Sequence, residues 1–264
     1  MSQTPVDIII PTFHGVKVVC DVTHQPMLLS SVDSLVACGE FYPVRVIVVN
    51  NGDQAFETGD DRVKVVKMRT NVGWERGLVE GLKHSTAEYV IFANDDIFVP
   101  AFSRWFVRDF VVQMRSDKSI AGIGPSSNVV AGPQNIWFPA QTSKIDVAWL
   151  IGFCVMYRRS VLDEIGGVDD TLPGGDDLDL GIRCRRAGYR LIADRSHFVY
   201  HHGFKTGNAI HGGPEVEGGW NSPQMTARTN AALVDKHGLE TVQQMFSPVE
   251  QPSSQPIAGN ASNK

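Results

Sequence analysis

The stretch Tyr89-Val90-Ile91-Phe92-Ala93-Asn94-Asp95-Asp96 decides the fold, because an uninterrupted apolar run leads directly into an amide and two carboxylates. Apolar residues of mostly β-branched and aromatic type, in a run of this length, predict a short β-strand. In open α/β sheets, ligands bind beyond the carboxyl ends of the strands. The stretch therefore predicts a strand of such a sheet and a binding site directly after it.

Similar runs occur upstream, and polar or turn-forming residues follow them. We expect strands at 6–10, 45–49 and 63–67, and helices at 27–37 and 75–84. Strands that alternate with helices at this spacing pair in parallel, with the helices as crossover connections. Farther along, we expect strands at 120–123, 148–157, 189–193 and 197–201, and helices at 102–113, 160–165, 177–187 and 222–237. The predicted fold class is α/β, with a mostly parallel central sheet flanked by helices.

Length and composition narrow the class of protein. The 264 residues suit one domain at 1–246, and the polar tail at 247–264 has little to bury and is expected to be disordered. A net charge of −5 does not indicate a nucleic-acid-binding surface, although a nucleic-acid acceptor stays possible. Four cysteines without metal-type spacing are typical of reduced thiols, and no apolar run approaches the ~18 residues of a transmembrane segment. We therefore expect a cytoplasmic protein.

The first acidic cluster is Asn94-Asp95-Asp96. Two adjacent carboxylates at a strand end are costly to hold together unless a cation neutralises them. Hard oxygen ligands suit Mn²⁺ or Mg²⁺, and the phosphates of a nucleotide suit the rest of the coordination sphere. A loop that uses Asn and Asp only for turn chemistry is the alternative interpretation.

The second acidic cluster is Gly174-Gly175-Asp176-Asp177-Leu178-Asp179, at the predicted start of a helix. Acidic residues at a helix N-terminus are common, because the helix dipole and the unpaired N–H groups stabilise them. Three acids in four residues nevertheless exceed what one cap requires. An ionised carboxylate at this position can accept a proton from a hydroxyl nucleophile.

Two further segments carry candidate site residues. His201-His202-Gly203 follows an apolar run, and its histidines are either metal ligands or hydrogen-bonded structural residues. The segment 71–77 introduces a helix whose N–H groups and Arg76 can face a phosphate. Lesser candidates are His14 and His211 in loops, Trp74 and Trp220 as stacking platforms, and the glycine-rich loop 203–219 as a lid.

In their order along the chain, these motifs resemble the family 2 glycosyltransferases of the GT-A fold, in particular the rhamnosyltransferase-like branch. The matching segments are Ile8-Ile9-Ile10-Pro11-Thr12-Phe13, Val48-Val49-Asn50-Asn51-Gly52-Asp53, Asn71-Val72-Gly73 through Gly77, Phe92-Ala93-Asn94-Asp95-Asp96 with Pro100, Gly152 to Arg159 with Gly166-Gly167-Val168-Asp169-Asp170, and Asp176-Asp177-Leu178-Asp179-Leu180 with its basic continuation to Tyr189, followed by His201. Each motif is loose by itself, but six in this order with compatible spacing are a specific signal.

The resemblance implies a GT-A (Rossmann-like) fold with a nucleotide-sugar-binding half at 6–100 and an acceptor-side half at 101–246. It implies a divalent metal site, for Mn²⁺ or Mg²⁺, at Asp95, Asp96 and His201, and a general base at Asp177. The donor-binding residues that it implies are Pro11, Thr12, Phe13, Asn50, Asn51, Gly73, Arg76, Asn94 and Asp95. The acceptor-side residues that it implies are Trp149, Gly152, Gly175, Asp176 and His202.

The implied activity is an inverting, metal-dependent transfer of a sugar from a nucleotide-diphosphate-sugar donor, of the UDP or dTDP type, to an acceptor hydroxyl. Three residues depart from the family pattern. Asn50 stands where an Asp usually contacts the base, Ala93 replaces the first acid of the metal motif, and Asp176 replaces a Glu. The acceptor stays open between a glycan, a lipid-linked sugar, a small molecule, a protein and a modified nucleic-acid base, and the oligomeric state is not predicted.

Two other functions are compatible with a nucleotide-binding α/β fold. A sugar nucleotidyltransferase would carry a glycine-rich loop with Arg or Lys after the first strand, but residues 12–24 contain one Gly and one Lys. A non-catalytic nucleotide-sugar-binding module would not need Asp96, Asp177 and His201 intact. The sequence therefore favours the glycosyltransferase.

Overall fold

Strand β1 (Val6–Thr12) lies in the middle of the parallel half of the sheet, and all of its residues are buried. The computed structural model describes residues 4–13, 15, 17–52, 54–203, 208, 212, 215–217, 222–249 and 251. β1 pairs in parallel with β2 (Val44–Asn50) and with β4 (Tyr89–Ala93), and β2 pairs in parallel with β3 (Val63–Lys67). The parallel pairing predicted for these four strands is confirmed, and each boundary lies within two residues of the prediction.

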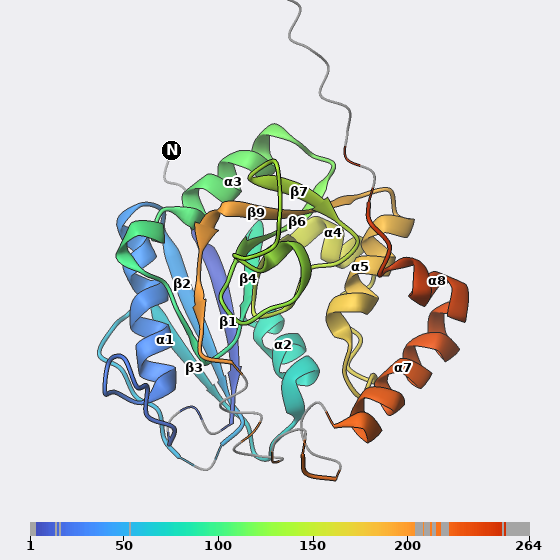
Figure 1. Ribbon diagram of the computed structural model, residues 1–264. Coiled ribbons are helices and arrows are strands. Elements are labelled where there is room, and N and C mark those ends of the chain that lie inside the picture. The colour runs from blue at the N-terminus through green and yellow to red at the C-terminus, as the bar shows by residue number, and fades with distance from the viewer. Residues whose placement is uncertain are drawn as a thin grey trace, which may run out of the picture.

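The second half completes an eight-stranded sheet of order β3-β2-β1-β4-β8-β6-β9-β7 (Figure 1). β8 (Cys154–Arg158) runs antiparallel to β4 and to β6 (Ile120–Ser126). β9 (Arg190–Phe198) is parallel to β6, and β7 (Lys144–Val147) closes the edge antiparallel to β9. The sheet is therefore mixed, with only β7 and β8 running against the other strands.

Helices cover both faces of the sheet. Alternate residues of β1 point to opposite faces and therefore belong to different cores. Ile8 and Ile10 belong to the core beneath α1 (Met27–Val36) and α3 (Phe106–Ser116). Ile9 belongs to the core beneath α2 (Gly73–Lys83), α4 (Arg159–Glu164) and α5 (Asp176–Arg186). The α/β class with a helix-flanked central sheet is thus confirmed (Figure 1).

Two predicted strands differ from the structure. The strand expected at 148–157 begins only at Cys154, because residues 148–153 turn across the end of the sheet, where the N–H of Ile151 donates to Gln134 Oε1 (2.7 Å). The strands expected at 189–193 and 197–201 are instead one long strand, β9, followed by β10 (Tyr200–His201). Sequence analysis did not predict β7 or the short strand β5 (Ile97–Phe98).

β5 and β10 form a small antiparallel ribbon beside the main sheet. His201 pairs with Ile97, and the N–H of His202 donates to the carbonyl oxygen of Asp96 (2.9 Å). These contacts join segments about a hundred residues apart in the sequence. The ribbon thereby places His201 against the acidic cluster that follows β4.

The C-terminal helices α7 (Pro223–His237) and α8 (Leu239–Gln244) pack against α5 through a third apolar cluster. Ser222 caps α7, since its Oγ accepts a hydrogen bond from the N–H of Met225 (3.3 Å). Gln251 makes two hydrogen bonds with the backbone of Asp146 in the edge strand β7. The N–H of Asp146 donates to Gln251 Oε1 (2.9 Å), and Gln251 Nε2 donates to the carbonyl oxygen of Asp146 (3.0 Å). Residues 250 and 252–264 of the expected disordered tail lie outside the described residues, so the disorder of the tail stays a prediction.

Three short 3₁₀ turns, Ala37–Glu40, Ala101–Ser103 and Gly132–Gln134, complete the described secondary structure. Within the described part of the chain, no helix is both long enough and apolar enough to cross a bilayer.

Candidate active site

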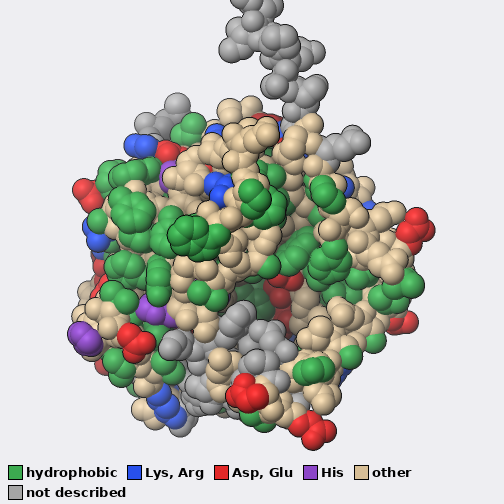
Figure 2. All heavy atoms as spheres, viewed as in Figure 1, with side chains coloured by type: hydrophobic (Ala, Val, Ile, Leu, Met, Phe, Trp, Pro, Cys, Tyr) green, Lys and Arg blue, Asp and Glu red, His purple; other side chains and the backbone are tan. Residues whose placement is uncertain are grey.

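A cavity of about 540 Å³ opens at the carboxyl ends of β1, β2 and β4. The first turns of α2 and α5 and the N-terminal half of α7 form its other walls, and Figure 2 shows the hollow with acidic side chains inside it. Its lining residues are Pro11, Thr12, Phe13, Asn51, Asn71, Gly73, Trp74, Glu75, Asn94, Asp95, Asp96, Ile151, Gly152, Phe153, Pro173, Gly174, Gly175, Asp176, Asp177, Met225, Thr226, Thr229 and Asn230. The cavity therefore collects both acidic clusters and most of the predicted site residues.

Asp95 is held from two sides. Its Oδ2 accepts a hydrogen bond from Thr12 Oγ1 (2.5 Å), and its carbonyl oxygen lies 2.7 Å from Ser31 Oγ. A Cβ on Gly15 would come within 2.5 Å of the same Oδ2, so the loop after β1 approaches this carboxylate as closely as only glycine allows. The position of Asp95 thus depends on β1, α1 and the loop between them.

Asp96 lines the cavity, and His201 is its buried neighbour. His201 Nε2 lies 3.1 Å from Asp96 Oδ1 and 3.2 Å from Asn94 Nδ2, and its Nδ1 lies 3.3 Å from the carbonyl oxygen of Val129. The ring stacks on Phe153, with centroids 5.5 Å apart and an interplanar angle of 22°. The structure therefore brings two of the three predicted metal ligands into direct contact.

Two asparagines at the end of β2 have different roles. Asn51 lines the cavity, its Nδ2 donates to the carbonyl oxygen of Gly73 (3.2 Å), and its buried Oδ1 has no hydrogen-bond partner in the structure. Asn50 instead shapes the turn, because its Oδ1 accepts from the N–H of Gly52 and its Nδ2 donates to the carbonyl oxygen of Gln54 (both 2.9 Å). A buried acceptor without a partner is available to a hydrogen-bond donor of a bound ligand. Asn51 is therefore a better candidate than Asn50 for contact with a nucleotide.

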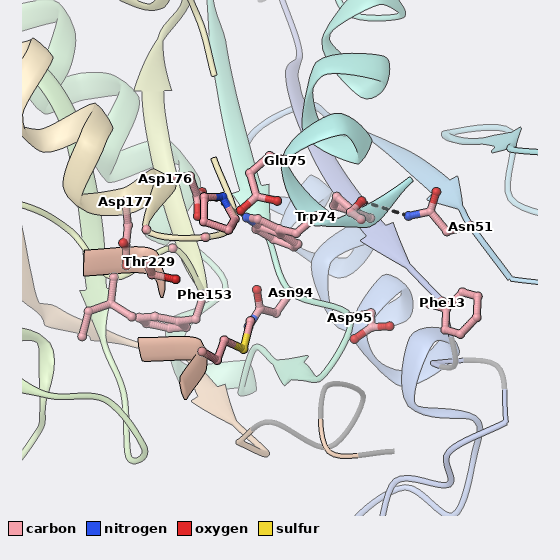
Figure 3. Close-up of a pocket in the computed structure, with 18 of the residues that line it drawn as sticks. Phe13, Asn51, Trp74, Glu75, Asn94, Asp95, Phe153, Asp176, Asp177 and Thr229 are labelled. Carbon is pink, nitrogen blue, oxygen red and sulfur yellow. Dashed lines mark hydrogen bonds between the residues drawn. The ribbon is translucent and has the colours of Figure 1, made fainter. Parts of the chain in front are cut away.

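The opposite wall carries Asp176 and Asp177 in the first turn of α5. Trp74 Nε1 donates to Asp176 Oδ2 (3.0 Å), and the N–H of Leu178 donates to Asp177 Oδ1 (2.8 Å). Gly175 adopts φ 80°, and a Cβ there would lie 2.9 Å from side-chain atoms of both Leu233 and Thr229. Glycine is therefore required where α7 approaches α5 beside these carboxylates (Figure 3).

The surroundings of these acids raise their pKa values. Burial, followed by the charge of Asp176, raises the pKa of Asp177 to about 7. Burial also raises the pKa of Asp176, and burial with the charges of Asp176, Asp177 and Asp170 raises the pKa of Glu75 to about 7. Desolvated carboxylates that repel one another are typical of catalytic sites.

The charge of the cavity wall is one-sided. Its described lining contains five carboxyl groups, at Glu75, Asp95, Asp96, Asp176 and Asp177, and no Lys, Arg or His. An anionic ligand bound there would be repelled unless a cation accompanied it.

Several predicted site residues lie outside the cavity wall. Arg76, expected to bind the donor, is exposed and pairs with Asp170 (3.4 Å). Trp149, expected on the acceptor side, packs edge-on against Phe246. The Nε2 atom of His202 lies 3.4 Å from Cys20 Sγ. Asn50 binds the backbone of its own turn. The position of a residue in a motif or near a helix end does not determine in which direction its side chain points, so the sequence could not predict these four orientations.

Conversely, sequence analysis assigned no role to some of the wall. Glu75, within the segment 71–77, has no role in the sequence-based prediction, and Trp74 and Glu75 both lie in the first turn of α2. The face of α7 that carries Met225, Thr226, Thr229 and Asn230 was missed, although its one-turn spacing was a usable signal. His14, His211, Trp220 and most of the loop 203–219 lie outside the described residues.

Comparison with known proteins agrees with this geometry. The model of glycosyl transferase family 2 matches residues 7–101, the part that carries β1 to β4 and the first acidic cluster. An uncharacterised protein of Mycobacterium tuberculosis is 29% identical over 182 residues, which cover 64% of this chain and 67% of that protein. The N-acetylglucosaminyl-diphospho-decaprenol L-rhamnosyltransferase of the same organism is 35% identical over 77 residues, which cover 26% of this chain and 25% of that enzyme.

Solved structures share the fold over most of the chain. The mannosyltransferase PcManGT from Pyrobaculum calidifontis, in complex with GDP-Man and Mn²⁺, superposes with a TM-score of 0.56 at 18% identity, over 92% of this chain and 74% of that one. A TarS fragment from S. aureus, in complex with UDP-GlcNAc, superposes with a TM-score of 0.58 at 13% identity, over 91% and 71%. The fold is therefore that of the GT-A glycosyltransferases. Over residues 7–101, the chain is similar to glycosyl transferase family 2.

Proposed function

We propose that the protein is an inverting, metal-dependent glycosyltransferase that moves a sugar from a nucleotide-diphosphate sugar to an acceptor hydroxyl. The observation that carries this proposal is the one-sided charge of the cavity, with carboxylates at both ends and no basic side chain in its described lining. A diphosphate cannot bind beside Asp95 and Asp96 without a compensating cation. Metal dependence follows from this electrostatic requirement.

The side chains beside β4 supply part of the ligand set for such an ion. Asp95 and Asp96 supply hard oxygens, and His201 directs Nδ1 toward the carbonyl of Val129, which leaves Nε2 as the coordinating nitrogen of the ring. In the described part of the chain, no three His, Cys, Asp or Glu side chains are grouped to hold an ion by themselves. We therefore expect Asp95, Asp96 and His201 to share Mn²⁺ or Mg²⁺ with the donor's phosphates, and the ion to neutralise the charge of the leaving diphosphate.

The nucleotide and the sugar occupy opposite ends of the same cavity in this proposal. Pro11, Thr12, Phe13 and Asn51 line the end near β1 and β2, where Asn51 Oδ1 would accept a hydrogen bond from the base or the ribose. A UDP- or dTDP-sugar is the donor that we favour. The complexes of the structural relatives with UDP-GlcNAc and GDP-Man support a nucleotide-sugar donor in general.

Asp177 is the proposed general base. It lines the acceptor side of the cavity, and the N–H groups at the start of α5 stabilise its ionised form. As the acceptor oxygen forms its bond to the anomeric carbon, the bond to the diphosphate breaks with its electron pair, and the hydroxyl proton passes to Asp177. One displacement of this kind inverts the anomeric configuration.

The reaction takes place in a protein whose four cysteines are buried free thiols. Unpaired cysteines are expected in a reducing compartment, which supports the cytoplasm as the location.

The proposal is tested by incubating the protein with Mn²⁺ and a panel of UDP-, dTDP- and GDP-sugars. We expect protection against thermal unfolding and release of nucleoside diphosphate for at least one donor. Asp96→Ala should abolish the metal-dependent protection, whereas Asp177→Asn should retain it and lose transfer. Asp163→Asn, at an exposed position of α4, serves as the matched control. Equal protection in Asp96→Ala would overturn the metal–nucleotide assignment.

A further inference from the structure

Trp74 is an aromatic side chain of the cavity wall to which the proposed mechanism gives no task. It is the second residue of α2 and packs, partly buried, against the core cluster beneath α2, α4 and α5. The same side chain lines the cavity. The indole is therefore supported by the core and open to a ligand.

The polar edge of the indole is already used. Trp74 Nε1 donates a hydrogen bond to Asp176 Oδ2 at the start of α5 (3.0 Å), across 102 positions of the sequence. This N–H is the only hydrogen-bonding group of a Trp side chain. Trp74 can therefore bind a ligand in the cavity only through the apolar surface of its ring.

The backbone before Trp74 is held as well. The N–H of Gly73 donates to Asn71 Oδ1 (3.0 Å), and its carbonyl oxygen accepts from Nδ2 of Asn51, directly after β2 (3.2 Å). Trp74 is thus fixed from the β2 side through its backbone and from the α5 side through its ring. A rigid aromatic side chain loses little conformational entropy when a ligand binds, which makes it an effective contact surface.

Trp74 lies where the proposed reaction needs the transferred sugar. Figure 3 shows it between Asp95 on one side and Asp176 and Asp177 on the other. In the proposed function, the diphosphate binds with the metal beside Asp95, and Asp177 takes the proton of the attacking hydroxyl. The anomeric carbon is bonded to the diphosphate and is attacked by that hydroxyl, so the sugar ring must lie between these two groups. This is the stretch of the wall that Trp74 occupies.

We propose that the indole of Trp74 stacks on the ring of the transferred sugar and thereby holds the anomeric carbon between the diphosphate and Asp177. This inference rests on the proposed function and adds to it the residue that recognises the sugar. The C–H groups on one face of a pyranose carry partial positive charge, and they match the negative face of an aromatic ring. Trp74 exchanges no proton or electron pair with the sugar, so it is a binding residue and not a catalytic one.

Calorimetric titration in Mg²⁺ tests the stack. The probes are the nucleotide sugar that gives the strongest thermal protection in the donor panel and the nucleoside diphosphate of the same base. Trp74→Leu removes the ring and should weaken binding of the nucleotide sugar about two- to tenfold, while binding of the nucleoside diphosphate should stay the same. Trp137→Leu, which changes an exposed tryptophan outside the cavity wall, should match the wild type for both probes. Equal weakening of both probes by Trp74→Leu, or of neither, would overturn the proposal.

Two further variants separate the ring of Trp74 from its hydrogen bond to Asp176. Trp74→Phe keeps an aromatic face and loses the N–H, whereas Trp74→Gln keeps an N–H donor and loses the ring. Stacking predicts that Trp74→Phe retains more affinity for the nucleotide sugar than Trp74→Gln does. The reverse order would show that Trp74 acts only by orienting Asp176, and the proposal would then be wrong.

A signature of stacking is also measurable in the wild type, so it does not depend on the folding of a variant. Protons held over the face of an indole experience its ring current. The ring protons of the bound sugar should therefore shift upfield in ¹H NMR spectra of the complex with the same nucleotide sugar and Mg²⁺, and the shift should be absent in Trp74→Leu. Sugar protons that do not shift in the wild type would contradict the stack.

Failure of this inference and failure of the proposed function give different results. If neither the nucleotide sugars nor the nucleoside diphosphates bind in the presence of the metal, the proposed function fails and the inference fails with it. If both bind, but the sugar protons do not shift and Trp74→Leu does not distinguish the two probes, only the role of Trp74 fails.

Discussion

His237 Nε2 lies 2.7 Å from Asp179 Oδ1 in the interior between α7 and α5. Lys236 Nζ approaches the same oxygen at 2.6 Å, and Arg183 Nη2 approaches the other carboxylate oxygen at 2.5 Å. Asp179 itself is fully buried. This cluster attaches α7, which lines the cavity, to α5, which carries Asp177 two residues before Asp179.

Asp179→Asn should destabilise the protein by about 3–5 kcal/mol, because it removes the buried anion on which Arg183, Lys236 and His237 converge. Burial alone would raise the pKa of Asp179, but hydrogen bonds from Arg183 and Lys236 outweigh it and lower the pKa. A carboxyl group with a lowered folded-state pKa stabilises the fold above its unfolded pKa of about 3.9 and loses this contribution as the pH falls further. Urea denaturation from pH 7 to pH 3 measures both effects. Asp235→Asn, an exposed change on α7, is the control, and an equal loss there would refute the role of the cluster.

Asp177→Asn should stabilise the protein near pH 8. The pKa of Asp177 is raised to about 7 by burial and by Asp176, so ionisation costs folding free energy as the pH rises from the unfolded pKa toward 7. We expect a gain of about 1–2 kcal/mol at pH 8, reduced by partial solvent access, and none below about pH 4. Thermal unfolding at both pH values, with the exposed Asp163→Asn as control, checks this. A variant that is less stable at pH 8 would show that Asp177 is structural.

His201→Ala should weaken nucleotide binding only when the metal is present. Loss of a metal ligand or its orientation typically costs 10- to 100-fold in metal affinity. Calorimetric titration with UDP, in Mn²⁺ and in EDTA, should therefore show at least about a tenfold loss in Mn²⁺ and little change in EDTA. His84→Ala, on the outer side of α2, should match the wild type in both buffers. Equal losses with and without metal would mean that His201 only supports the packing on Phe153.

Gly175→Ala and Gly188→Ala form a matched pair that flanks α5. Both glycines have positive φ, 80° and 85°, so each alanine should cost about 1 kcal/mol of backbone strain. A Cβ at 188 has open space around it, whereas a Cβ at 175 would lie 2.9 Å from Leu233 and Thr229. We therefore expect Gly175→Ala to lose more stability in denaturant titration and to disturb the α7 wall. Equal losses of stability in the two variants would show that Leu233 and Thr229 of α7 can move away from the added Cβ without a loss of stability.

The parallel half of the sheet was predictable because its signals are local. The strands β1, β2 and β4 are buried along almost their whole length, and buried parallel strands appear in the sequence as nearly continuous apolar segments. The edge strand β3 is only partly buried, but it too ends before turn residues. The strand at 148–157 was overestimated for the same reason, since Ile151 and Phe153 are apolar but line the cavity. Short edge strands such as β7 carry little apolar signal and were missed.

The sequence by itself determined the α/β class, the two acidic clusters and their placement at the ends of β4 and the start of α5. These properties depend on apolar runs, turns and caps within a few residues. Only the tertiary structure decided which side chains face the cavity. It turned Asn50 and Arg76 away, brought His201 to Asp96 through the β5–β10 ribbon, and added Glu75 and α7 to the wall. Such contacts depend on register and helix packing across distant segments, which local patterns do not encode.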